Sequence, residues 1–325
     1  MKTPMMIMGL ATATIALAGA VAAEYPERPI QMVIPYGPGG VSDLSARALA
    51  GPLGQIVPQP LVLTNRAGAG GAIGSVSVRD ADADGYTLLF ARVGTHTVNP
   101  AMNPNLPYTV DEFRFIAIYE LNPVACVVDA GSDIHTIDDL IERVRGNPGE
   151  VAFSHPGAGT LPYLGGLMVL DAFGVADPLD NVIDIPTESD AASLTAVLQQ
   201  TTEFFCGSTS SAAGFVANGQ MRPLLVTSPE PVVGFDAPTV ADLGKPELQA
   251  LVGWTGIAGP AGLSDEVVEK WAGWLVEAVK DAEFRGFMDA GGSVVNLMSP
   301  DESVAFIESA YQNFRRLVLE LDLEL

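Results

Sequence analysis

The chain has 325 residues, enough for about two domains of roughly 150 residues each, and 48% of them are hydrophobic, which excludes a generally disordered chain. Its 39 acidic and 16 basic residues give a formal net charge of −23, which excludes nucleic acid and anionic membranes as partners attracted by charge. An anionic ligand would therefore have to be held by groups that act at short range.

The first 23 residues have the pattern of an export signal. Lys2 supplies a positive charge, an apolar run follows, and the small residues Ala20 to Ala23 suit cleavage near Ala23. A membrane anchor is the alternative, but the polar sequence "EYPERP" directly afterwards favours cleavage. No later stretch of 18 residues is uninterruptedly apolar, so we expect no membrane span in the exported chain.

Apolar runs alternate with helical patterns along the next hundred residues. Strands are predicted at Pro29–Pro35, Gln59–Asn65, Tyr86–Ala91 and Pro123–Asp129, and Ser42 is expected to cap the helix that follows the first of them. Strands that alternate with helices indicate parallel pairing and an α/β architecture.

A second alternating block and a helical tail follow. Caps are predicted at Thr136 with Asp139, at Ser264, and at Ser299 with Glu302. The tail helices are expected to pack on the first lobe. We therefore predict two α/β lobes with a cleft between them: residues 24–125 plus 226–325, and residues 126–225. Further strands are predicted within 150–155, 201–211 and 220–228, and a helix at 162–173.

A repeated strand–loop–helix pattern is the strongest indication of function in the sequence. Three times a strand runs into a glycine-rich loop and then a helix, in "PYGPGGVSD", "NRAGAGGAIG" and "SHPGAGTLP". Such loops lie at the carboxyl ends of strands, where glycine lets a ligand approach and the N–H groups of a helix start attract an anion. Ser42, Ser154 and Thr160 are candidate hydroxyl donors. The alternative for each loop alone is an ordinary tight turn.

Other chemistries match the sequence less well. The last glycine of "GAGGAIG" comes one residue late for a dinucleotide fingerprint, and no loop carries the Gly-Lys-Ser/Thr of a phosphate-binding loop. There is no G-x-S-x-G elbow, and Asp43 suits a helix start better than catalysis. The sequence has no zinc-ligand spacing, so neither a metal nor a cofactor is expected. Cys126 and Cys206 are expected to be two buried thiols, with a disulfide as the alternative in an exported chain.

Five segments in the same order resemble the solute-binding proteins of tripartite tricarboxylate transporters, the Bug or TctC-like family. They are "YPERPIQMVIPYGPGGVSDLSAR", "LTNRAGAGGAIG", "DGYTLLFA", "GTHTVNPAM" and "GWTGIAGPAGLSDEVV", and they span nearly the whole exported chain. The resemblance implies a periplasmic, monomeric, two-lobe protein with a type II binding-protein fold. Such a protein closes on a small organic carboxylate and delivers it to the permease subunits of the membrane, without catalysis or a cofactor.

The same resemblance implies where the ligand lies. The loop after the first strand would hold the carboxylate, the loop from Ser154 to Leu161 would meet the ligand from the other lobe, and the segment Gly94 to His96 would lie near the cleft. The predicted ligand-binding residues are Tyr36, Gly37, Pro38, Gly39, Gly40, Ser42, Asp43, Thr95, His96, Ser154, Gly157, Ala158, Gly159, Thr160, Leu161 and Ser208.

Two segments depart from the common pattern of the family on the second lobe's side. "CGSTSS" has Gly207 and Ser208 where many members have an Asp followed by Asn or Gln. Thr187 and Glu188 in "PTESDAASL" replace an aromatic residue and a lysine. The ligand therefore stays open among di- or tricarboxylates, acidic amino acids and aromatic acids. Two other roles also stay open: signalling to a membrane sensor kinase, and an exported enzyme that uses Asp43 and a histidine.

Overall fold

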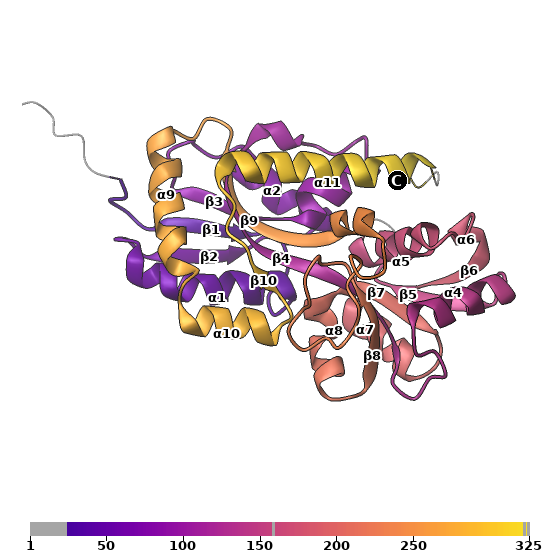
Figure 1. The fold of residues 1–325 in the computed structure, drawn as a ribbon. Helices are drawn as coiled ribbons and strands as arrows, with labels where there is room; N and C mark the ends of the chain where they lie inside the picture. The colour runs from indigo at the N-terminus through magenta and orange to yellow at the C-terminus, as the bar shows by residue number, and fades with distance from the viewer. Residues whose placement is uncertain (1–24, 158–159, 321–322, 324–325) are drawn as a thin grey trace, which may run out of the picture.

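One long strand, β4 (Phe113–Asp129), runs through the centre of the structure, a computed structural model (Figure 1). Residues 113–123 of β4 pair with β9, whereas residues 124–129 pair with β7 and β8. The strand therefore joins two halves of the molecule, and its partners change after Pro123. The structure describes residues 25–157, 160–320 and 323, so the predicted export signal lies outside the described residues.

The first half is a mixed sheet in the order β2–β1–β3–β9–β4, with helices on both faces. Alternate residues of β1 point to opposite faces: Met32 belongs to a buried cluster with Trp271 of α9, and Val33 to a cluster with Phe314 of α11. The strands β1, β2 and β3 are parallel, so their carboxyl ends lie at one edge of the sheet. The elements of this half are β1 (Ile30–Ile34), α1 (Val41–Ile56), β2 (Leu61–Asn65), α2 (Ala72–Arg79), β3 (Thr87–Arg92), α3 (Asn99–Met102), β9 (Val252–Pro260), α9 (Asp265–Ala278), α10 (Ala282–Ala290), β10 (Val294–Val295) and α11 (Pro300–Glu320).

Short helices of other types also occur in this part of the chain, namely the 3₁₀ helices Ala69–Gly71, Val110–Glu112 and Pro246–Ala250 and the π-helical segment Gly94–Val98.

The second half continues the sheet from β4 through β7, β5 and β6, and β8 pairs with β4. Helix α5 is buried along nearly all its length, and its Leu164 packs in one cluster with Phe153 of β5 and Phe204 of β7. On the other face, Leu194 of α7 shares a cluster with Phe205. The elements of this half are α4 (Ile137–Gly146), β5 (Val151–His155), α5 (Leu161–Ala172), α6 (Pro178–Asn181), β6 (Val182–Pro186), α7 (Asp190–Leu198), β7 (Phe204–Ser208), α8 (Thr209–Ala217) and β8 (Met221–Val226).

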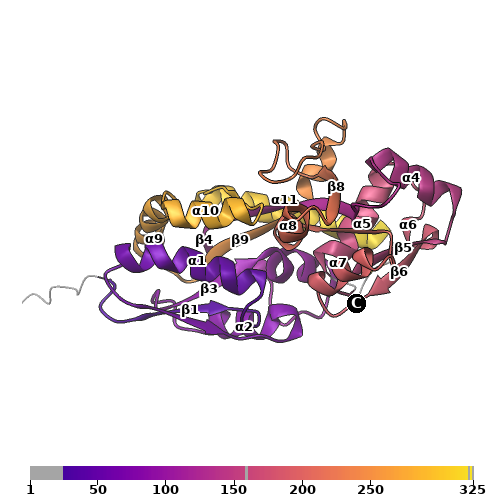
Figure 2. The same ribbon diagram turned by 90° about the horizontal axis from the view of Figure 1, so that it is seen from below.

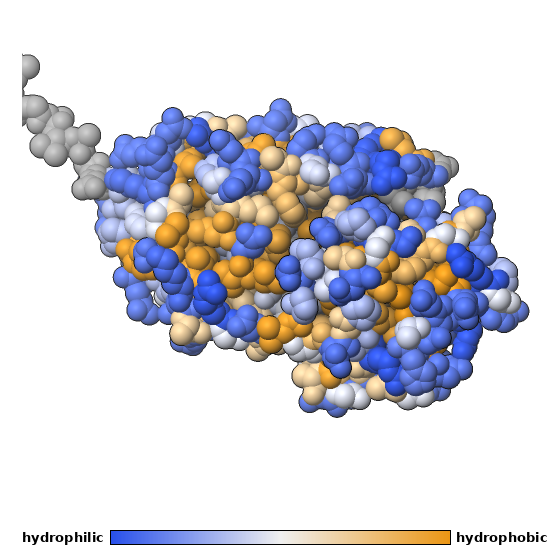
Figure 3. All heavy atoms as spheres, viewed as in Figure 1, coloured by the Kyte–Doolittle hydropathy of each residue, from blue (hydrophilic) through white to orange (hydrophobic). Residues whose placement is uncertain are grey.

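The molecule is elongated, with α1, α2 and α9 toward one end and α4, α5, α6 and α7 toward the other (Figure 2). The tail helices pack on the first half as the sequence predicts: α9 and α10 contact α1, and α11 contacts β4 and α3. Hydrophilic residues cover much of the outer rim of the second half, and hydrophobic residues show in the band between α11 and α10 (Figure 3). The two-lobe α/β fold is thus confirmed, while the exact lobe boundaries stay a prediction.

Three of the predicted helix starts are confirmed. The hydroxyl of Thr136 accepts a hydrogen bond from the Asp139 N–H, Ser264 caps α9, and Ser299 and Glu302 bond each other's backbone N–H groups at the start of α11. The prediction for Ser42 is wrong. Helix α1 begins at Val41, so its cap residue is Gly40, two residues before Ser42, and glycine offers no side chain to the helix start.

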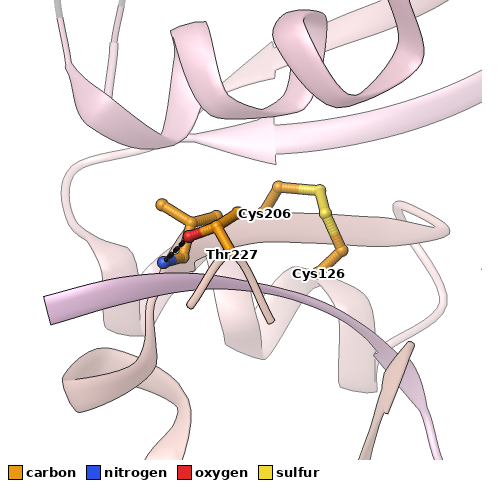
Figure 4. Close-up of a disulfide and its surroundings, with 4 residues drawn as sticks. Cys126, Cys206 and Thr227 are labelled. Carbon is orange, nitrogen blue, oxygen red and sulfur yellow. Dashed lines mark hydrogen bonds between the residues drawn. A yellow bond between two sulfur atoms is a disulfide. The ribbon is translucent and has the colours of Figure 1, made fainter. Parts of the chain in front are cut away.

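The expectation of two free thiols is also wrong. Cys126 of β4 and Cys206 of β7 stand directly opposite each other in the antiparallel ladder, both fully buried, and they form a disulfide (Figure 4). Beside this bridge, the Thr227 hydroxyl accepts a hydrogen bond from the Val124 N–H at 2.8 Å. The spacing of 80 residues gives no hint of the pairing, because it depends on the register of two strands.

Candidate ligand-binding cleft

A cleft of about 930 Å³ lies between the two halves, and residues of both halves line it. Three smaller pockets, of about 370, 420 and 520 Å³, are lined by residues of the first half alone. Of these four pockets, the large cleft is therefore the one that can close on a ligand from two sides. Its lining from the first half is Tyr36, Gly37, Pro38, Gly39, Gly40, Val41, Ser42, Leu44, Arg92, Val93 and Gly253, and from the second half Pro156, Leu161, Pro162, Glu188, Ser189, Asp190, Ala191, Ser208, Ser210 and Ser211.

The loop between β1 and α1 forms the first wall. No side chain caps α1, so the backbone N–H groups of its first turn keep their capacity to bond a ligand. Gly39 has φ of +79°, a conformation that other residues rarely adopt, and a side chain there would meet nothing within 4 Å. The loop is thus shaped for an approaching group rather than packed against a neighbouring element.

Asp43 holds this loop in place instead of facing the cleft. Its carboxylate is only 3% exposed and accepts hydrogen bonds from the Gly39 N–H at 2.9 Å, the Asn65 amide at 2.9 Å and the Arg47 guanidinium at 2.8 Å. These donors, Arg47 first, lower the pKa of Asp43 to about 2 although burial opposes the shift. Asp43 is therefore an anionic support that orders the loop behind the surface a ligand would touch.

Thr95 and His96 are brought near the loop but do not line the cleft. The ring of His96 is fully buried among aromatic rings, 4.6 Å from that of Phe113 and 5.5 Å from that of Phe115, and burial lowers its pKa to about 3. The Thr95 hydroxyl bonds the Arg92 carbonyl and the His96 ring. Both residues belong to the core that supports the site, because neither presents a polar atom to the cleft.

The second glycine-rich loop, residues 66–74, is likewise a support. A side chain at Gly71 would lie 2.4 Å from the Thr95 methyl group, and one at Gly74 would lie 2.7 Å from the backbone of Pro35. These glycines let α2 approach the end of β1 closely. This loop does not appear among the cleft-lining residues, so of the three glycine-rich loops the first contributes its backbone to the cleft most directly.

In the second half, Leu161 and Ser208 line the cleft, and other predicted residues lie behind or beside them. The buried Ser154 hydroxyl donates to the Ser193 carbonyl at 2.9 Å, and the Thr160 hydroxyl donates to the Gly157 carbonyl at 2.7 Å. Both hydroxyls are thus engaged within the protein. Ala158 and Gly159 lie outside the described residues.

Sequence reasoning missed two charged groups of the cleft, Arg92 and Asp190. The predicted third strand ends at Ala91, but β3 extends by one residue and places Arg92 at its carboxyl end. Asp190 follows the cap Ser189 at the start of α7, and its carboxylate accepts a hydrogen bond from the Ser211 hydroxyl at 2.5 Å. The position of Arg92 at a strand end was the available signal, whereas that of Asp190 depends on how the halves face each other.

Within residues 25–157 and 160–320, no group of three His, Cys, Asp or Glu side chains is arranged to hold a metal ion. None of the helices in the described part of the chain combines the length and the apolarity needed to span a membrane.

The family described as "Tripartite tricarboxylate transporter family receptor" matches residues 45–323. Protein BugT of Bordetella pertussis is 29% identical over 97% of this chain and 96% of its own length. A solved structure titled as that of a periplasmic transporter is 27% identical, with a TM-score of 0.80 over 93% of this chain and 99% of its own. The periplasmic binding protein BugD, also 27% identical, gives a TM-score of 0.77 over 92% of this chain and 99% of its own.

Proposed function

The chain belongs to the tripartite tricarboxylate transporter receptor family, and on that premise we propose that it captures a small organic carboxylate and presents it to the membrane subunits of a transporter. The family consists of receptors, so the chain is a binding protein rather than an enzyme. We place the mature protein in the periplasm, because its N-terminal sequence has the pattern of an export signal and its relative BugD is a periplasmic binding protein.

The observation that carries this proposal is the uncapped start of α1 at the wall of a cleft shared by both halves. The first-turn N–H groups and the positive end of the helix dipole favour a carboxylate. They act over a few ångströms, so they can hold an anion on a chain whose net charge of −23 repels it at long range. The residues we assign to ligand contact are Tyr36, Gly37, Pro38, Gly39, Gly40, Ser42, Leu161 and Ser208.

Closure of the halves would complete the binding step. Residues of both halves line the cleft, so bringing the halves together would remove the ligand from water. Hydrogen bonds between N–H groups and a carboxylate strengthen as the surroundings become less polar. Asp43, Thr95, His96, Ser154 and Thr160 would keep the two walls in shape without touching the ligand.

A thermal-shift screen of mono-, di- and tricarboxylates tests the proposal. A ligand present at about 100 times its dissociation constant stabilises the folded state by about 2.7 kcal/mol, which raises the melting temperature by several degrees. We expect at least one carboxylate to do so and to be recovered chemically unchanged. Stabilisation by neutral sugars or by cations alone would contradict the proposal.

A further inference from the structure

Arg92 is a buried cation at the wall of the cleft. The parallel register of β1 and β3 pairs Val33 with Leu89, which places Arg92 beside Tyr36 at the carboxyl ends of the two strands. Arg92 lines the cleft, yet only 8% of its surface is exposed. Its guanidinium therefore meets the cleft from a largely desolvated position.

The guanidinium has no counter-ion in the described part of the chain. Its Nη1 atom is buried without a hydrogen-bond partner, and no described carboxylate lies within 4.0 Å of it. Glu120 stands two strands away, across Thr255 of β9, but the hydroxyls of Ser45 and Ser293 already bond its two oxygens. A buried charge without a partner is strongly unfavourable, so this position suits an anion supplied by a ligand.

The facing wall has the opposite charge. Asp190 lines the cleft from the start of α7, with Glu188 beside it, and its hydrogen-bond partner is the neutral hydroxyl of Ser211. No Lys or Arg side chain of the described residues pairs with it within 4.0 Å. Burial raises the pKa of its carboxyl, although Ser211 and the more distant charge of Arg92 act against the shift. A partly buried carboxylate without a cationic partner suits a cation in the ligand.

We propose that the cleft is polarised, with Arg92 binding the carboxylate of the ligand and Asp190 binding an ammonium group, so that the ligand is a small amino acid rather than a dicarboxylate. This inference rests on the proposed function, since it names the chemical class of the carboxylate. A second carboxylate would lie against Asp190 and Glu188, where like charges repel it. An ammonium group there removes the repulsion, so that the ligand's two charges compensate those of Asp190 and Arg92.

Five probes with four carbon atoms test the polarity by calorimetry on the whole exported chain: butanoate, succinate, and 2-, 3- and 4-aminobutanoate. We expect at least one aminobutanoate to bind about tenfold or more tightly than butanoate and succinate, because one charge-assisted hydrogen bond contributes that much. Asp190→Asn should remove this preference while keeping the affinity for butanoate within about twofold of the wild-type value. Arg92→Gln should lower the affinity for every carboxylate probe by about 100-fold, because the substitution removes one partner of the buried charge pair that forms with the ligand.

Folding is checked separately, since a variant that misfolds also fails to bind. The ligand-free Arg92→Gln protein should melt at or above the temperature of the wild type, because the substitution removes an uncompensated buried charge. Arg316→Gln and Asp171→Asn change the net charge equally on exposed helix surfaces and should leave all affinities unchanged. If succinate binds more tightly than every aminobutanoate, or if Arg92→Gln binds normally, the polarity is wrong and the carboxylate proposal stands. If no carboxylate binds the wild type, the proposed function itself fails.

Discussion

At the scale of single residues, Gly39 separates a binding role of the first loop from a structural one. We expect Gly39→Val to lower ligand affinity by about tenfold or more, because a β-branched residue at φ of +79° distorts the loop and its side chain enters the cleft. The same strain should lower the free energy of unfolding by about 1–2 kcal/mol. Calorimetry and urea unfolding measure the two effects.

Gly234 is a matched control for this substitution. It has φ of +83°, a side chain there would also meet nothing within 4 Å, and it lies outside the cleft lining. Gly234→Val should therefore destabilise the protein by a similar amount and leave ligand affinity intact. Equal affinities of the two variants would show that the first loop has a structural role only.

At the scale of elements, the disulfide ties β4 to β7 across a loop of 80 residues. Replacing Cys126 and Cys206 together with Ala should lower the free energy of unfolding by about 2–4 kcal/mol, mainly because the unfolded chain regains freedom. The ladder from Val124 to Val128 keeps its backbone pairing, so ligand affinity should stay within about twofold. Urea unfolding with and without reductant measures the effect. Identical midpoints for the oxidised, reduced and double-variant proteins would contradict it.

The elements also show which signals a sequence carries locally. The caps at Thr136, Ser264 and Ser299 were predictable because each depends on residues three apart. The first part of β4 and the whole of β9 were missed, since these strands pair with each other across 129 to 147 residues, from Pro123 with Val252 to Phe113 with Pro260. The loop between β1 and α1 was also predictable, because its glycines lie close together in the sequence. Arg92 carried a local signal too, since it ends a predicted strand, whereas Asp190 needed tertiary structure because its place depends on how the two halves face each other.

At the scale of the whole molecule, buried histidines make stability depend on pH. His96 is fully buried and its folded-state pKa is about 3, well below the value of about 6.5 expected in an unfolded chain. The unfolded state therefore binds more protons between these values, and the free energy of unfolding falls as the pH drops below about 6.5. At pH 5, His96 should lower the free energy of unfolding by about 2 kcal/mol. Burial also lowers the pKa of His155, which adds a loss of the same sign.

The test compares variants rather than the wild-type curve alone, because protonation of a chain with a net charge of −23 also relieves repulsion and raises stability. As the pH falls from 8 to about 4.5, the free energy of unfolding of His96→Phe should rise relative to that of the wild type, because only the wild type loses stability through His96. Stopping there avoids the range in which Asp43, with a pKa of about 2, begins to lose its bonds to the first loop. His135→Phe, at an exposed position, controls for the change in composition. If the His96→Phe and wild-type curves run parallel, His96 takes up protons equally well in both states, and the aromatic core behind the cleft is open enough to hydrate it.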